Sequence, residues 1–217
     1  MAKVILFQGD SITDAERDRN DNGPQATRGF GYATMVAGTL GFETPGEYEF
    51  YNRGVSGNRV LDLYARIVKD TLNLKPDYLS ILIGVNDVWH GIDWANGTGY
   101  ERFYKVYSML VAELKAELPN IKIMILEPFV LKGYATANRE DQPERFKIFR
   151  EGVLEMARLA KRVAEENNLK FVPLQEKFEK AAENTEQTYW LGDGVHPTAM
   201  GHELIKREWL KAFGEIK

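Results

Sequence analysis

Residues 4–13 have the sequence Val4-Ile5-Leu6-Phe7-Gln8-Gly9-Asp10-Ser11-Ile12-Thr13. The run of four apolar residues is too short for a helix and rich in branched side chains, so it predicts a buried β-strand that ends at Gly9. In an open α/β sheet, ligands bind beyond the carboxyl ends of the strands, which is where this stretch places the hydroxyl group of Ser11. A lone serine at this point is also typical of a helix N-cap, so a catalytic role requires a partner elsewhere in the chain.

Such a partner occurs near the other end of the chain, in the stretch Trp190-Leu191-Gly192-Asp193-Gly194-Val195-His196-Pro197. A serine hydroxyl is a weak nucleophile until a base removes its proton, and histidine titrates near neutral pH. An imidazole base in turn needs a carboxylate to fix its tautomer. Asp193 and His196 can supply the carboxylate and the base from one turn, and the chain has only three histidines. The predicted catalytic residues are therefore Ser11, Asp193 and His196.

Two further turns follow predicted strands and have groups suited to a developing negative charge. A second strand over residues 48–52 leads into Arg53-Gly54-Val55-Ser56-Gly57-Asn58-Arg59, whose backbone N–H groups suit an anion, although a tight turn would need the same glycines. A third strand over residues 78–83 leads into Gly84-Val85-Asn86-Asp87-Val88-Trp89-His90. The Asn86 amide can donate to an oxyanion without changing the charge balance, but an Asn-Asp pair after a strand also predicts an ordinary turn.

Three residues of these turns are weaker candidates. Ser56 is an alternative nucleophile and His90 an alternative base, but nothing else in the chain favours either over Ser11 and His196. We assign Asp87 to loop structure rather than to chemistry.

The four blocks resemble those of the SGNH (GDSL-type) hydrolases, in the family's order and over nearly the whole chain. The blocks are Gly9-Asp10-Ser11, Gly57, Gly84-Val85-Asn86-Asp87 and Asp193-x-x-His196. The chain departs at Ile12, where the family name has Leu, a change of similar volume. The resemblance implies a serine esterase without a cofactor, in which the Ser11 and Gly57 N–H groups and the Asn86 side chain form the oxyanion hole. We expect activity to fall as the pH drops through roughly 6–7, because His196 becomes protonated.

Strands that alternate with helices predict a parallel sheet covered on both faces. The resemblance implies a three-layer α/β/α, flavodoxin-like fold with five parallel strands in the order 2-1-3-4-5. That order would place Ser11, Gly57 and Asn86 at the ends of three adjacent central strands. The other strands are expected at 121–128 and, at the sheet edge, 169–174. Helices are expected at 29–40, from 60 onward, and at 100–118, 144–167 and 198–213. No linker or repeat is visible, so residues 1–217 are predicted to form a single domain.

Composition excludes several classes of function. The net charge is −4 with no basic stripe, so no nucleic-acid partner is expected, and no apolar run is long enough for a transmembrane helix. There are no cysteines, and the predicted nucleophile lies too close to the N-terminus to survive signal cleavage, so we expect a cytoplasmic protein. The string Asp18-Arg19-Asn20-Asp21-Asn22-Gly23 opens like a calcium loop, but Gly29 stands where a bidentate Glu is needed, so no metal is expected.

The resemblance is greatest to the acetylxylan esterase and carbohydrate acetylesterase branch, which implies a small acetylated carbohydrate as substrate. Trp89, Trp94, Tyr189 and Trp190 would suit the apolar faces of sugar rings, although core or loop packing explains each of them equally well. A lipid-directed esterase, lysophospholipase or thioesterase on the same scaffold is an alternative, and a non-catalytic carbohydrate-binding module is another. The branch includes oligomers, so a homo-oligomer is also an open expectation.

Overall fold

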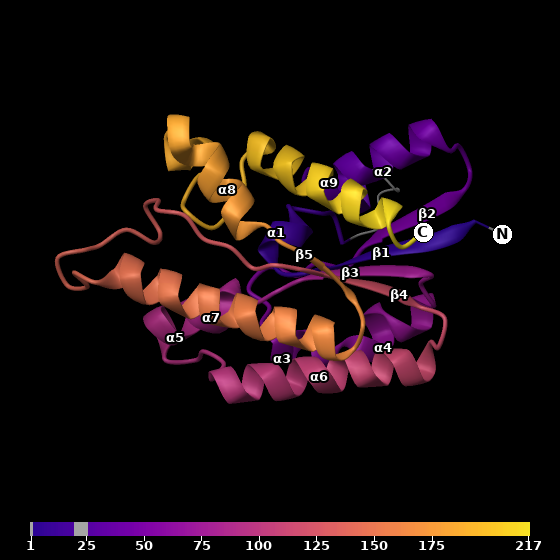
Figure 1. Ribbon diagram of the computed structural model, residues 1–217, viewed down its shortest axis with the longest axis horizontal. Helices are drawn as coiled ribbons and strands as arrows, with labels where there is room; N and C mark the ends of the chain where they lie inside the picture. The colour runs from indigo at the N-terminus through magenta and orange to yellow at the C-terminus, as the bar shows by residue number, and fades with distance from the viewer. Residues whose placement is uncertain (1, 20–25) are drawn as a thin grey trace.

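A five-stranded parallel sheet forms the centre of the computed structural model, which describes residues 2–19 and 26–217 (Figure 1). The strands lie in the order β2-β1-β3-β4-β5, as predicted. Their bounds are β1 Lys3–Gly9, β2 Tyr48–Asn52, β3 Tyr78–Leu82, β4 Lys122–Leu126 and β5 Lys170–Val172. The register pairs Phe7 with Asn52 and Gly9 with Leu82, so the turns that follow β1, β2 and β3 emerge together at one edge. One expectation was wrong: β2 is an edge strand, so the three strands that lead to Ser11, Gly57 and Asn86 are adjacent but not all central.

Helices cover both faces of the sheet (Figure 1). On one face α2 (Tyr32–Glu43) packs against α9 (Ala199–Gly214), beside α8 (Gln175–Ala181). On the other face α6 (Tyr100–Glu117) packs against α7 (Arg145–Glu166), with α3 (Val60–Ala65), α4 (Ile67–Asp70) and α5 (Val85–Trp94) beside them. None of the helices described over residues 2–19 and 26–217 combines the length and apolar character that a bilayer crossing requires.

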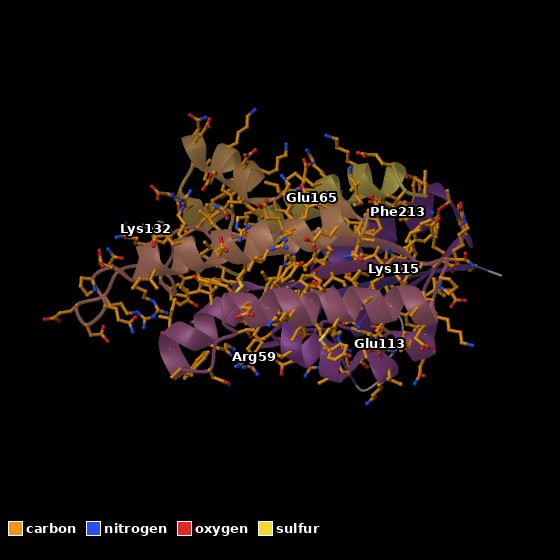
Figure 2. The ribbon with its side chains drawn as sticks, turned by 60° about the horizontal axis from the view of Figure 1, so that its bottom comes forward. Arg59, Glu113, Lys115, Lys132, Glu165 and Phe213 are labelled. Atoms are coloured by element: carbon orange, nitrogen blue, oxygen red, sulfur yellow. The ribbon has the colours of Figure 1, made fainter. Side chains whose placement is uncertain are left out.

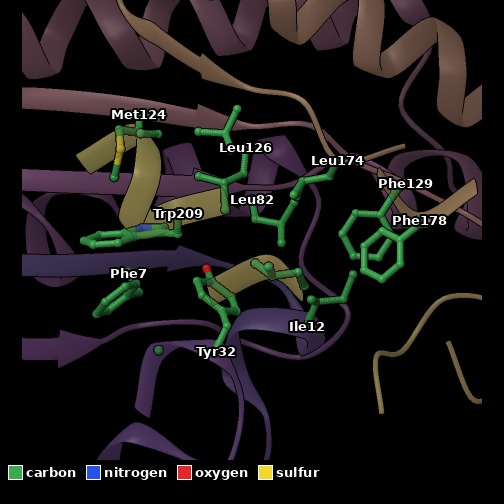
Figure 3. Close-up of a cluster of buried hydrophobic side chains, with 14 of the residues drawn as sticks. Phe7, Ile12, Tyr32, Leu82, Met124, Leu126, Phe129, Leu174, Phe178 and Trp209 are labelled. Carbon is green, nitrogen blue, oxygen red and sulfur yellow. The ribbon is translucent and has the colours of Figure 1, made fainter. Parts of the chain in front are cut away.

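The strands supply side chains alternately to two cores, because successive residues of a strand point to opposite faces. Ile5 and Phe7 join the core under α2 and α9, whereas Leu6 joins the core under α3, α6 and α7. In the first core the ring of Phe7 lies 5.4 Å from that of Trp209 (Figure 3). Charged side chains such as Lys115 of α6 and Glu165 of α7 stand on the outer surface (Figure 2). This two-sided burial fixes the sheet and therefore the positions of the turns at its carboxyl edge.

Several helix boundaries differ from the predicted ones. The helix expected at 29–40 begins at Tyr32, because Gly29 has a positive φ of 72° and Gly31 is the extended N-cap residue. The helix expected from residue 60 divides into α3 and α4 at Arg66, whose guanidinium turns back to the carbonyl oxygens of Gly9 and Arg53. The remaining three long helices lie within a residue or two of their predicted bounds.

Among residues 2–19 and 26–217, three α-helices were not predicted. These are the four-residue α1 (Ser11–Asp14), α5, which replaces the turn expected at Asn86-Asp87, and α8. The N-cap residue Leu174 and the first residue of α8, Gln175, donate their N–H groups to the carboxylate of Glu127 at 2.6 and 2.9 Å. A distant residue at the end of β4 therefore supplies the cap that local sequence does not show.

Candidate active site

Ser11 is the first residue of α1 and follows β1 after a single residue, Asp10. The N-cap is Asp10, whose Oδ1 accepts a hydrogen bond of 2.9 Å from the Ile12 N–H. The Asp10 side chain is buried, and burial raises the pKa of its carboxyl to about 7. Because Asp10 performs the capping, the hydroxyl of Ser11 is not needed for it and is available for chemistry.

Ser11, His196 and Asp193 are brought together although Ser11 and His196 are 185 residues apart. The Ser11 Oγ lies 2.8 Å from His196 Nε2, and His196 Nδ1 lies 2.6 Å from Asp193 Oδ2. The hydrogen bond to Asp193 raises the pKa of His196 above its ordinary value, against the effect of burial. Burial of Asp193 opposes its ionisation, but hydrogen bonds from His196 hold its pKa below the usual range. The geometry is that of a nucleophile, a base and an orienting carboxylate.

The turn that carries Asp193 and His196 is stabilised by hydrogen bonds within the turn and by hydrogen bonds from the loop after β4. Asp193 Oδ1 accepts the N–H groups of Val195 and His196 at 2.8 and 2.7 Å. The loop after β4 adds two backbone hydrogen bonds, from Leu131 to Gly194 and from Ala135 to Asp193. Gly133 of that loop lies so close that a Cβ would stand 2.2 Å from the Asp193 carbonyl carbon. This support depends on contacts between distant segments, and no sequence motif indicates it.

The turn after β2 leaves one backbone donor unused. Hydrogen bonds occupy the N–H groups of the surrounding residues, namely those of Arg53, Gly54, Val55, Ser56 and Asn58. Within residues 2–19 and 26–217 the N–H of Gly57 has no acceptor, and Gly57 adopts a φ of 81° with open space where a Cβ would point. A free, rigidly held N–H at this edge of the sheet is suited to an oxyanion.

Asp14 holds this turn beside α1. Its Oδ2 accepts both the N–H and the hydroxyl of Ser56 at 2.9 Å, and Arg19 pairs with the same carboxylate at 2.5 Å. The hydroxyl of Ser56 is thereby committed to Asp14, whereas that of Ser11 faces an imidazole. These different surroundings agree with the preference for Ser11 over Ser56 that the sequence indicated.

Asn86 lies in the first turn of α5, not in a loop, and is buried. Its Nδ2 donates to the Asn58 carbonyl oxygen at 3.1 Å, which links α5 to the turn that contains Gly57. An amide nitrogen carries two hydrogens, so one N–H remains for a ligand. Asp87, expected to be a loop residue, is also on α5 and accepts the Val60 N–H at the start of α3. Burial raises the pKa of Asp87 to about 7.

The four aromatic candidates lie in different surroundings. The ring of Trp89 is 6.0 Å from that of His196, and its Nε1 donates to Asp93 at 2.7 Å. Trp190 donates its Nε1 to the Thr185 hydroxyl and packs against Tyr189, just before the catalytic turn. Trp94 is exposed at the far end of α5. Of the four, Trp89 is the one whose ring lies beside His196.

The structure does not favour His90 as the base or the calcium-like string at residues 18–23 as a metal site. His90 packs edge-on against Trp94 at 4.9 Å, and burial lowers its pKa. Residues 20–23 of the calcium-like string lie outside the described residues. Within the part of the chain that is described, no group of three or more His, Asp or Glu side chains is arranged to hold a metal ion.

Known proteins show the same organisation. The profile of the GDSL-like lipase/acylhydrolase family matches residues 7–204. An acetylxylan esterase from Geobacillus stearothermophilus is 34% identical over 214 residues, which cover 97% of this chain and 93% of that protein. A solved structure of a GDSL-like lipase from Parabacteroides merdae matches with a TM-score of 0.88 and 38% identity, over 99% of this chain and 97% of the other.

The structure of the Geobacillus esterase, Axe2, gives a TM-score of 0.82 at 33% identity, over 98% of this chain and 94% of Axe2. Structures of its catalytic mutants, in which a serine, an aspartate or a histidine is replaced by alanine, match with TM-scores from 0.82 to 0.84. The similarity therefore extends over both chains almost completely.

Proposed function

The chain belongs to the GDSL-like lipase/acylhydrolase family and is a carboxylic ester hydrolase, and on that premise we propose that it removes acetyl groups from carbohydrates such as acetylated xylo-oligosaccharides. The reaction proceeds through an acyl-enzyme on Ser11. The observation that carries the proposal is the hydrogen-bonded series from Ser11 through His196 to Asp193, beside the unused N–H of Gly57.

The first half of the reaction transfers the acetyl group to the enzyme. His196 Nε2 removes the proton from Ser11 as Oγ attacks the acetyl carbonyl carbon, and Asp193 stabilises the imidazolium that forms. The N–H groups of Ser11 and Gly57 and the Asn86 amide donate to the oxyanion. His196 then gives its proton to the sugar oxygen, which leaves as an alcohol. In the second half His196 activates a water molecule, and acetate is released from Ser11 through a second tetrahedral intermediate.

The surroundings of the triad favour a sugar ester. The His196 side chain is 42% exposed, so a hydrophilic leaving group can remain in water while its acetyl group reaches Ser11. The Trp89 ring lies beside His196 and packs on Phe149 at 5.7 Å, which provides one rigid apolar wall for a small acyl group or a sugar face. The similarity to an acetylxylan esterase supports the same substrate class.

The test compares hydrolysis of 4-nitrophenyl acetate and of acetylated xylo-oligosaccharides by the wild type, Ser11→Ala and His196→Ala. We expect each substitution to reduce turnover of both substrates on the order of 10⁶-fold. Ser108→Ala, on α6, and His90→Ala are matched controls that should retain activity. Full activity of Ser11→Ala would overturn the mechanism.

Acyl-chain length tests the substrate separately from the mechanism. We expect acetyl esters to be cleaved faster than octanoyl esters. The reverse order would assign the enzyme to lipid esters or thioesters on the same catalytic residues.

A further inference from the structure

A cavity of about 540 Å³ lies beside the turn that contains Gly57. Its walls come from the segment after α1, from the turn after β2 and from the end of α4, and Val55 contributes to it. Two residues of chain span at most about 7 Å, so the backbone of Val55, which lines the cavity, lies within that distance of the Gly57 backbone. A volume of this size is in the range that binds small ligands.

Four cationic side chains line the cavity, namely Arg17, Arg19, Arg53 and Lys69. The whole protein has a net charge of −4, so a cluster of four cations at one site contrasts with the overall negative charge. Two carboxylates, Asp18 and Asp70, also line the cavity. Asp70 is engaged outside it, because its Oδ2 accepts from Arg66 at 3.0 Å.

The cations are only partly neutralised. Arg17 and Arg19 share the single carboxylate of Asp14, at 3.9 and 2.5 Å. Arg53 and Lys69 have no carboxylate within 4.0 Å among residues 2–19 and 26–217. Arg53 instead faces the ring of Tyr51, with its guanidinium carbon 5.8 Å from the ring centre.

This cation cluster is connected to the candidate active site through hydrogen bonds. Asp14, which pairs with Arg19, accepts both donors of Ser56, the residue before Gly57. Arg17 Nε donates to the Gly54 carbonyl oxygen at 2.8 Å in the same turn. An anion in the cavity would therefore contact arginine side chains that are hydrogen-bonded to the turn containing Gly57 or to Asp14, which holds that turn.

We propose that this cavity binds the carboxylate of an acidic sugar, so that the enzyme prefers acetylated oligosaccharides that carry a uronic acid close to the acetyl group. The proposal rests on the proposed function, since it specifies the substrate of that same site. Guanidinium groups present paired donors that match a carboxylate, and Lys69 adds an unpaired charge at the exposed end. The local positive charge also offsets the repulsion that an acidic protein exerts on an acidic substrate.

The test measures kcat/KM for two xylo-oligosaccharides with the same acetylation, one neutral and one bearing a glucuronic acid. For the wild type we expect the acidic substrate to be favoured about tenfold at low salt, the size of one charge-assisted contact, with the preference reduced at high salt. Lys69→Glu and Arg53→Gln should each bring the ratio of kcat/KM for the acidic substrate to kcat/KM for the neutral substrate close to one. Lys211→Glu on α9 makes the same change in charge elsewhere and should leave both the ratio and the activity unchanged.

A second measurement asks whether the cavity binds the acidic sugar by itself, without the rest of the oligosaccharide. Calorimetric titration with glucuronate alone should show binding to the wild type that Lys69→Glu abolishes. Equal kcat/KM for the acidic and neutral substrates, or a preference that survives both substitutions, would overturn the proposal. If the wild type cleaves neither oligosaccharide, the proposed function is wrong. In that case the calorimetric titration still tests the anion site, and absence of glucuronate binding would overturn it.

Discussion

At the scale of single residues, the proposed chemistry depends on the protonation state of His196. Its Nδ1 lies 2.6 Å from Asp193, and this hydrogen bond raises the pKa of the imidazole above its ordinary value. Only the neutral imidazole can accept the Ser11 proton, and a raised pKa keeps the protonated form present to higher pH. We therefore expect kcat/KM to rise with pH, with a midpoint above that of an ordinary histidine, which shifts the fall in activity expected from the sequence at roughly pH 6–7 to higher pH. A profile from pH 5 to 9 under conditions where chemistry limits the rate would measure this midpoint.

Asp193→Asn gives the matching control for that profile. Asparagine can still accept the two backbone N–H groups at its amide oxygen, but its NH₂ group favours the wrong imidazole tautomer. We expect activity to fall on the order of 10⁴-fold, and the midpoint of the residual activity to move to lower pH because the charge that raises the His196 pKa is gone. An unchanged midpoint would show that Asp193 does not set that pKa.

In the proposed mechanism Asn86 donates one N–H of its amide to the oxyanion. Asn86→Ala removes that donor and also its hydrogen bond to the Asn58 carbonyl. We expect kcat to fall on the order of 10²–10³-fold with little change in KM for 4-nitrophenyl acetate, because the donor acts on the charge that develops in the transition state. Circular dichroism and the melting temperature would show whether α5 keeps its structure. A rise in KM at constant kcat would place Asn86 in ground-state binding instead.

At the scale of elements, Asp14 at the end of α1 orders the turn after β2. Asp14→Asn replaces one of the two carboxylate oxygens with an NH₂ group, so either the two donors of Ser56 or the Arg17 N–H loses its acceptor. The substitution also removes the charge that pairs with Arg19. We expect turnover to fall about tenfold, less than for loss of an oxyanion donor, because the Gly57 N–H is displaced rather than removed. Ser56→Ala keeps the backbone hydrogen bond to Asp14 and should lose less activity than Asp14→Asn. If Ser56→Ala were as inactive as Ser11→Ala, Ser56 rather than Ser11 would be the nucleophile.

The same elements show how far sequence reasoning reaches. The strands and the long helices are predictable because apolar residues recur with a clear period, as in β1, α6 and α7. Helix α5 was missed because Gly84 and the Asn-Asp pair are turn formers, although Val85, Val88, Trp89 and Ile92 follow a helical spacing. The candidate site could be proposed because its residues follow strands and appear as short motifs. Gly133 and the paired donors of Ser56 act only through contacts between distant segments, which a single sequence does not display.

At the scale of the whole molecule, one buried cation joins three segments that are far apart in the chain. The Arg145 side chain is fully buried at the start of α7, and its two terminal nitrogens donate to Asp93 of α5 at 2.5 and 2.9 Å. Its Nε donates to the Ala135 carbonyl oxygen, in the loop that also supports Asp193. Asp93 in turn accepts from Trp89, whose ring lies beside His196. Both sides of the catalytic turn are thus connected through Arg145.

Arg145→Met should therefore affect both stability and catalysis. Removal of one member of a buried ion pair leaves the other charge without a partner. Asp93 is 19% exposed and can be partly solvated, so we expect a loss of about 3 kcal/mol in the free energy of unfolding, at the lower end for such pairs. Urea denaturation would measure this loss. Arg158→Met, on the same helix, breaks a solvent-exposed pair with Glu155 and should lower the free energy of unfolding far less than Arg145→Met does. Under conditions where Arg145→Met is still folded, we expect it to lose activity several-fold because Trp89 and the loop at Ala135 are no longer held together, whereas Arg158→Met keeps full activity. Equal stability losses in the two variants, or full activity in folded Arg145→Met, would show that the connection through Arg145 does not hold the catalytic turn.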